Sequence, residues 1–140
     1  MLTLIGNLKL YLLLSVTLRL LRRAQRNSER VRALMREEGF VFQIQTARGA
    51  GGYFELRGGV MKLEHGLHPR PDLVQIWSSG NEAFRVMISS DETEVLRAFE
   101  LGQCRMQGDF LIALWFNEVM KIARGRDSMQ VTAFLAAAKA

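Results

Sequence analysis

The sequence predicts an α+β fold in which helices cover one face of a five-stranded, mainly antiparallel sheet, with an extra helix at the N-terminus. The length of 140 residues is enough for one domain with a real core. The spacing of apolar residues changes from a helical period to a period of two at Phe40. Glycine pairs then separate short alternating segments, as in hairpins.

Residues 1–27 are predicted to form an apolar and basic helix that associates with a membrane. The uncharged run between Lys9 and Arg19 has nine residues, fewer than the roughly twenty that span a bilayer. Residues 1–36 have a charge balance of +7 and the remainder −2, so the basicity favours an anionic membrane surface over nucleic acid. The predicted membrane-binding residues are Leu10, Tyr11, Leu12, Leu13, Leu14, Arg19, Arg22, Arg23 and Arg26.

A second interpretation of this helix stays open, in which it packs against its own domain or in a dimer. If the helix inserts, the arginines that follow it keep the domain in the cytoplasm, attached to the inner membrane peripherally or through its N-terminus.

Cys104 is the single cysteine, which excludes an internal disulfide and fits a reducing compartment. We expect its side chain to be a small core hydrophobe.

Residues 28–126 are predicted to form the folded domain. A short helix capped by Asn27 or Ser28 leads into the sheet. Alternation and glycine turns predict five strands, at residues 40–45, 53–57, 60–64, 73–77 and 84–88. A capped helix then follows, with Leu96 and Phe99 facing inward.

The stretch from Gln103 to Arg124 predicts a short strand, a pivot at Gly108-Asp109 and a helix that is apolar on every side from Phe110 to Phe116. Asp109 is expected to cap this helix. A helix that is apolar all round must be covered on several faces by protein, lipid or an apolar ligand. Residues 127–140 form a tail that can add a short helix.

No catalytic constellation is visible in the sequence. Arg48 to Gly52 lacks the ending of a phosphate-binding loop and predicts a hairpin turn. His65 and His68 have no third metal ligand nearby. We therefore expect no enzyme activity, no metal and no cofactor.

The run FRVMISSDETEVLRAFELGQ, followed by CRMQGDFLIALWF, resembles the sterol carrier protein 2 (SCP2-like) lipid-binding domains. That family shows a strand, an acidic-capped helix, a strand and then Gly-Asp or Gly-Asn before a leucine-rich helix. The resemblance covers about residues 28–124. Residues 1–27 have no counterpart in the minimal domain, although a leucine-rich leader is similar to that of bacterial SCP2-like accessory proteins of ubiquinone biosynthesis.

The resemblance implies an apolar tunnel between the sheet and its covering helices. The alternative for each lining residue is ordinary core packing. The residues that the resemblance places in a lipid-binding tunnel are Phe84, Val86, Ile88, Leu96, Phe99, Met106, Phe110, Leu111, Leu114, Trp115 and Val119.

The sequence and the resemblance favour two functions. In the first, the protein binds and transfers or presents a fatty acyl, sterol-like or isoprenoid lipid at a membrane surface without catalysis. In the second, it is a scaffold or accessory subunit, for example in ubiquinone biosynthesis, whose apolar helices bind partner proteins. The expected partners are a lipid ligand, an anionic membrane surface and a second copy or a partner enzyme, but not nucleic acid.

Overall fold

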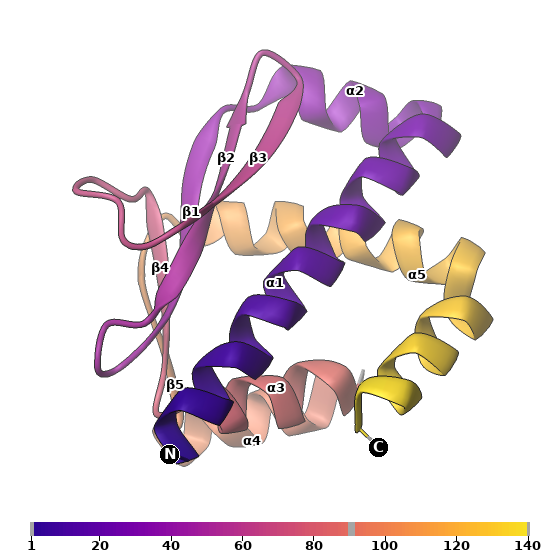
Figure 1. Ribbon diagram of the computed structural model, residues 1–140. Coiled ribbons are helices and arrows are strands. Elements are labelled where there is room, and N and C mark those ends of the chain that lie inside the picture. The colour runs from indigo at the N-terminus through magenta and orange to yellow at the C-terminus, as the bar shows by residue number, and fades with distance from the viewer. Residues whose placement is uncertain (1, 90–91, 140) are drawn as a thin grey trace.

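The computed structural model of the protein describes residues 2–89 and 92–139, with the side chains of residues 4–89 and 93–124. It has an α+β fold in which a five-stranded sheet carries its helices on one side (Figure 1). The predicted fold class is therefore confirmed.

Five helices and five strands follow along the described chain in the order α1-α2-β1-β2-β3-β4-α3-α4-β5-α5. The strands lie in the order β3-β2-β1-β4-β5, and every neighbouring pair is antiparallel except β1 and β4, which are parallel. The helices are α1 (Leu2–Asn27), α2 (Glu29–Glu37), α3 (Gly80–Ser89), α4 (Glu92–Glu100) and α5 (Phe110–Lys139). The strands are β1 (Phe40–Thr46), β2 (Gly51–Arg57), β3 (Val60–His65), β4 (Leu73–Trp77) and β5 (Cys104–Gly108).

Alternation along the strands builds the core on the face that the helices cover. Phe42 and Ile44 of β1, Phe54 of β2 and Leu73 of β4 are all buried in the same cluster. Cys104 of β5 belongs to this cluster, and burial raises the pKa of its thiol to about 12. The prediction that Cys104 is a core residue is confirmed.

The connection between β3 and β4 lies against the opposite face of the sheet. Its His68 donates its backbone N–H to the side-chain oxygen of Gln43 at 2.7 Å. The His68 ring also stands edge-on to Tyr53. Asp72 accepts a hydrogen bond from the backbone N–H of Val41 at 2.7 Å. This connection brings β4 back beside β1, and so sets their parallel pairing.

The predicted strand at residues 84–88 is wrong, because this segment lies in α3. Ser79 caps the helix by accepting the backbone N–H of Glu82 at 3.1 Å. Phe84, Val86 and Ile88 alternate as in a strand. Over only five residues, however, that pattern does not distinguish the two-residue period of a strand from the 3.6-residue period of a helix. Ser79 followed three residues later by Glu82 is the capping signal that sequence reasoning missed.

The fifth strand of the sheet is instead β5, which ends in the predicted pivot. Gly108 has a φ of +117°, and an added Cβ would overlap the backbone carbonyl of Asp72. Asp109 then accepts the backbone N–H of Leu111 at 3.0 Å, which confirms it as the cap of α5. Ser28 caps α2 in the same way through Val31.

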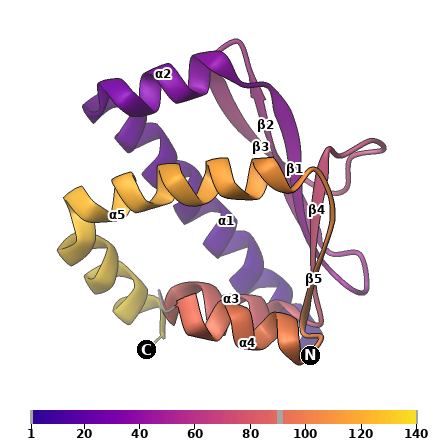
Figure 2. The same cartoon turned by 180° about the vertical axis from the view of Figure 1, so that it is seen from behind.

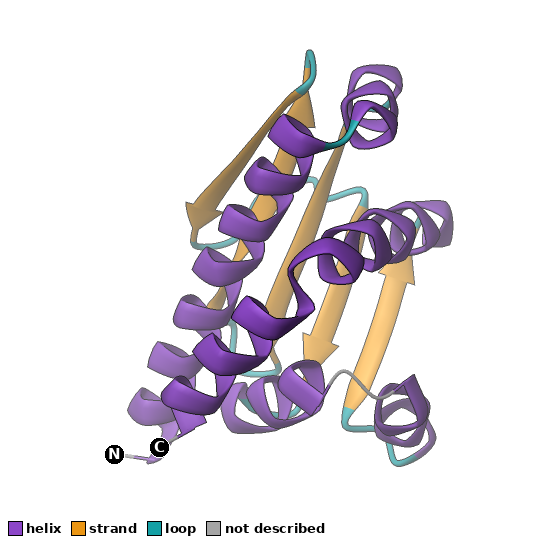
Figure 3. Ribbon diagram, turned by 90° about the vertical axis from the view of Figure 1, so that its right-hand side faces the viewer, coloured by secondary structure: helices purple, strands orange, loops and turns teal. Residues whose placement is uncertain are grey.

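Helix α1 lies across the helix side of the sheet and is part of the domain core. Leu10, Leu14 and Leu21 are completely buried, and they share the cluster of the sheet residues. Figure 3 shows α1 running beside β3 and β2, while α5 starts near β5 and runs across to meet α1. The first helix therefore closes the core over the strands on one side of the sheet.

Helices α1 and α3 meet at two glycines. A Cβ added to Gly80 would overlap the backbone carbonyl oxygen of Gly6, and one added to Gly6 would lie 3.1 Å from the backbone nitrogen of Asn81. Because neither residue has a side chain, the two backbones approach closely at this crossing. The crossing fixes the N-terminal half of α1 to the domain.

Replacing Leu14 with alanine should lower the free energy of unfolding by about 2–5 kcal/mol, since the change leaves a cavity under α1. The matched variant Leu12→Ala removes a leucine of the same helix that is 42% exposed, and it should change stability by less than about 1 kcal/mol. Urea unfolding followed by circular dichroism measures both. Equal effects would mean that α1 does not close the core.

The glycine crossing gives a second prediction. Gly80→Ala should destabilise the protein by about 1–3 kcal/mol, because the new methyl group overlaps the Gly6 backbone. In Gly39→Ala the new methyl group lies 3.5 Å from its nearest neighbour, the Leu56 carbonyl oxygen, so this control should unfold within about 0.5 kcal/mol of the native protein. A Gly80→Ala protein as stable as the control would contradict the close contact.

Candidate functional site

The predicted lipid-binding residues fall into two groups in the structure. Five of them fill space inside the protein or between its helices. Val86 and Val119 are completely buried in the main core. Phe84 and Ile88 of α3 pack with Leu13 of α1 in a smaller cluster. These four side chains hold helices together.

Trp115 completes this inward group. Its ring stands edge-on to Phe40 at a centroid distance of 4.9 Å, and its indole N–H donates to the carbonyl of Leu34 at 3.3 Å. The adjacent Phe116 stands edge-on to Phe42 at 5.0 Å. The inner side of α5 is thus packed on β1 and α2 through aromatic contacts.

The second group lies around the two ends of the edge strand β5. Leu96 on α4 and Phe110, Leu111 and Leu114 on α5 are 57–71% exposed. Leu101, which sequence reasoning did not include, follows α4 and is 65% exposed. We call these five residues, Leu96, Leu101, Phe110, Leu111 and Leu114, the β5-edge apolar set. Phe99 and Met106 are half-buried beside the main core.

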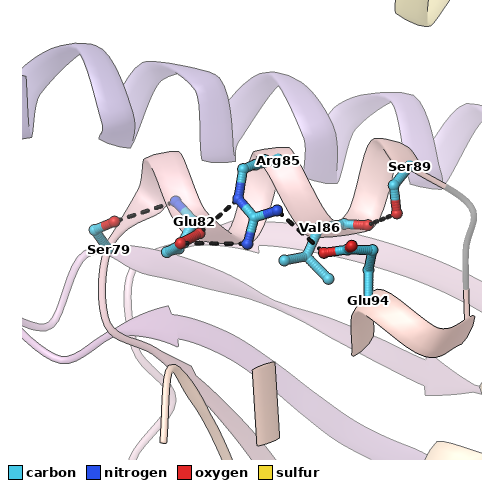
Figure 4. A network of polar contacts seen from close by, with 6 residues as sticks. All are labelled: Ser79, Glu82, Arg85, Val86, Ser89 and Glu94. Atoms are coloured by element: carbon cyan, nitrogen blue, oxygen red, sulfur yellow. Dashed lines mark hydrogen bonds and ion pairs between the residues drawn. The ribbon is translucent and has the colours of Figure 1, made fainter. Parts of the chain in front are cut away.

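An ion-pair network fastens α4 to α3 near this set. The guanidinium of Arg85 contacts Glu82 at 2.9 Å and Glu94 at 3.1 Å (Figure 4). The hydrogen bonds that Arg85 donates to Glu82 and Glu94 raise the pKa of its guanidinium above the ordinary value. The hydroxyl of Ser89 donates to the carbonyl of Val86 at the end of α3. Exposed ion pairs contribute little stability, so this network orients α4 more than it stabilises the fold.

A hollow of about 220 Å³ lies elsewhere, where α1, α3 and the ends of β1 and β4 meet. None of the predicted lipid-binding residues lines it. Its lining is mostly polar, as expected for a hollow open to water: Gly6, Asn7, Thr46, Arg48, Ser78, Ser79, Gly80 and Asn81. This hollow therefore does not correspond to the apolar tunnel that the resemblance implies.

The predicted membrane-binding residues of α1 point in different directions. Leu10, Leu13 and Leu14 are buried inside the protein, whereas Leu12 is exposed. Tyr11 is half-buried, with its ring edge-on to His65 at 5.1 Å. Among the basic residues of this prediction, Arg23 is half-buried and three are exposed: Arg19, Arg22 and Arg26.

The outward side of α1 also carries three large apolar side chains that the prediction omitted, Leu4, Ile5 and Leu8. The signal that would have found them is their spacing of three and four residues along with Leu12. By length and composition, residues 4–27 form one helix that is long and apolar enough to cross a membrane.

Within residues 4–89 and 93–124, no three His, Cys, Asp or Glu side chains are grouped so that they could hold a metal ion. His65 and His68 instead stand edge-on to Tyr11 and Tyr53. Cys104 is buried, and its raised pKa keeps the thiol protonated at neutral pH. A buried and protonated thiol of this kind has low reactivity.

The sequence matches no protein-family model and no curated protein. Solved structures do match. One is a ubiquinone synthesis protein described as UbiJ-SCP2, with a TM-score of 0.58 and 14% identity over 81% of this chain and 92% of that one. Another is the sterol carrier protein domain 2 of Helicoverpa armigera, with a TM-score of 0.51 and 18% identity over 77% of this chain and 85% of that one.

These similarities extend over most of both partners in each comparison. The identities are low, so the likeness concerns the path of the chain. The predicted resemblance is confirmed at the level of architecture: the chain has the SCP2-like fold.

Proposed function

We propose that the protein binds an apolar lipid without catalysis and presents it at the cytoplasmic face of a membrane. The observation that carries the proposal is the β5-edge apolar set, five large side chains that are more than half exposed around one strand. Large apolar side chains that are exposed at both ends of one edge strand are candidates for a ligand or partner site.

The place of the lipid follows from the packing. Phe54, Phe116 and Leu14 fill the layer between sheet and helices, so a lipid in that layer would have to displace them. A fatty acyl, sterol-like or isoprenoid chain laid over the β5-edge apolar set displaces nothing. Each methylene that it buries contributes about 0.8 kcal/mol.

The half-buried residues beside the set would extend such a site inward. Phe99 and Met106 already pack against the core on one side. A methionine adapts its shape to different ligands because it is unbranched and flexible. The SCP2-like fold supports this proposal as an analogy, since one fold can host several functions.

A lipid-uptake measurement tests the proposal. The full chain should yield co-purifying lipid in native mass spectrometry and should take up a fluorescent fatty acid in solution. Leu111→Glu with Leu114→Glu should weaken the uptake at least tenfold, because two carboxylates replace apolar contacts.

The control for that experiment is Leu67→Glu, which changes an exposed leucine in the connection between β3 and β4, away from β5. It should bind the fatty acid as the native protein does. A native protein without bound lipid and without uptake would rule the function out. Equal losses of fatty-acid uptake in both variants would mean that the lipid does not bind at the β5 edge.

A second candidate is an accessory subunit that binds a protein through the same set, either a second copy of the chain or a partner enzyme. It is favoured by the outward position of Phe110, Leu111 and Leu114 on α5, and by the similarity to a structure described as a ubiquinone synthesis protein. Sedimentation equilibrium separates the candidates. A dimer of the native chain that the Leu111→Glu, Leu114→Glu variant converts to a monomer, together with no lipid uptake, would support the subunit and not the carrier.

A further inference from the structure

The outward face of α1 is apolar in its first half and basic in its second. Leu4 and Leu8 are 62% and 59% exposed, and Ile5 and Leu12 are each 42% exposed. At 100° per residue, these side chains and those of three exposed arginines fall within a sector about 100° wide. The arginines are Arg19, Arg22 and Arg26.

The opposite face of the same helix belongs to the core. Leu10, Leu14 and Leu21 are completely buried against the domain. To cross a bilayer, α1 would have to withdraw these three leucines and expose the sheet residues under them. The helix can meet a membrane without unfolding the domain only by lying flat, with its outward face toward the lipid.

The charges of α1 identify what can cover this face. The helix contains five basic side chains and no Asp or Glu. In the part of the chain that the structure describes, Arg19 and Arg26 make no ion pair, and Arg22 only donates to the carbonyl of Met61 at 3.4 Å. These cations are therefore available to an anionic partner.

We propose that the outward face of α1 docks on the surface of an anionic lipid bilayer. The leucines of the first half enter the boundary between head groups and acyl chains, and the arginines of the second half contact the head groups. Figure 1 shows α1 in front of α5, with no helix or strand in front of α1. This inference rests on the proposed function and deepens it, because it names the kind of bilayer and the residues that dock on it.

Vesicle sedimentation with the full chain tests the docking surface. The protein should bind vesicles of phosphatidylcholine with phosphatidylglycerol, and not vesicles of phosphatidylcholine alone. Leu8→Glu should reduce that binding at least tenfold, while the control Leu67→Glu stays within twofold of the native protein. Both positions are exposed, so urea unfolding should show unchanged stability in both variants.

The contribution of the arginines is measured in the same assay. Arg19→Gln with Arg26→Gln should weaken binding to anionic vesicles about twenty-five-fold, or about fivefold for each charge. The control Arg57→Gln with Arg70→Gln removes two exposed charges from other elements, and it should leave binding within twofold. Alkaline carbonate should release the bound protein, because the helix lies on the bilayer.

Three results would overturn the docking surface: Leu8→Glu binds like the native protein, neutral vesicles bind as well as anionic ones, or carbonate fails to release the protein. Fatty-acid uptake in the absence of vesicles is measured alongside. Loss of vesicle binding with normal uptake contradicts only the docking surface, and normal vesicle binding without uptake contradicts only the lipid carrier.

Discussion

The contact between the inward leucines of α1 and the sheet is the constraint on which the rest of the structure depends. Leu10, Leu14 and Leu21 are completely buried over strands whose Phe42 and Phe54 would otherwise face water. The glycine crossing with α3 holds the other end of the same helix. A helix that closes a core in this way has only its outward half left for a partner. The composition of α1 is that of a helix able to span a membrane, whereas in this fold its inward leucines are buried in the domain core.

Local signals predicted most of the elements. The change of period at Phe40, the glycine turns and the caps at Ser28 and Asp109 act within a few residues, so the sequence alone shows them. The exception is α3, because alternation over Phe84 to Ile88 fits both periods. The parallel pairing of β1 with β4 depends on a connection that crosses the sheet. No short sequence pattern predicts a pairing between segments so far apart in the chain.

The candidate site was harder to predict than the fold, because hydrophobicity does not say which side of a helix faces the core. The helix from Phe110 to Phe116 reads as apolar all round, yet Ile112 and Phe116 are buried while Leu111 and Leu114 are exposed. In α1, likewise, Leu10 is buried whereas Leu12 is exposed. A helical wheel sorts such residues into groups. Which group points inward is decided by strands distant in the sequence.

The two exposed apolar surfaces differ in charge and direction, and this difference argues for separate partners. The outward face of α1 has basic residues and no acid, whereas the start of α5 combines Asp109 and Glu118 with Lys121. In Figure 1 α1 lies nearest the viewer, and in Figure 2, seen from behind, α5 does. A bilayer under α1 would therefore leave the start of α5 facing away from it. A molecule docked on anionic lipid through α1 would then still have its β5-edge apolar set free for a lipid or a protein.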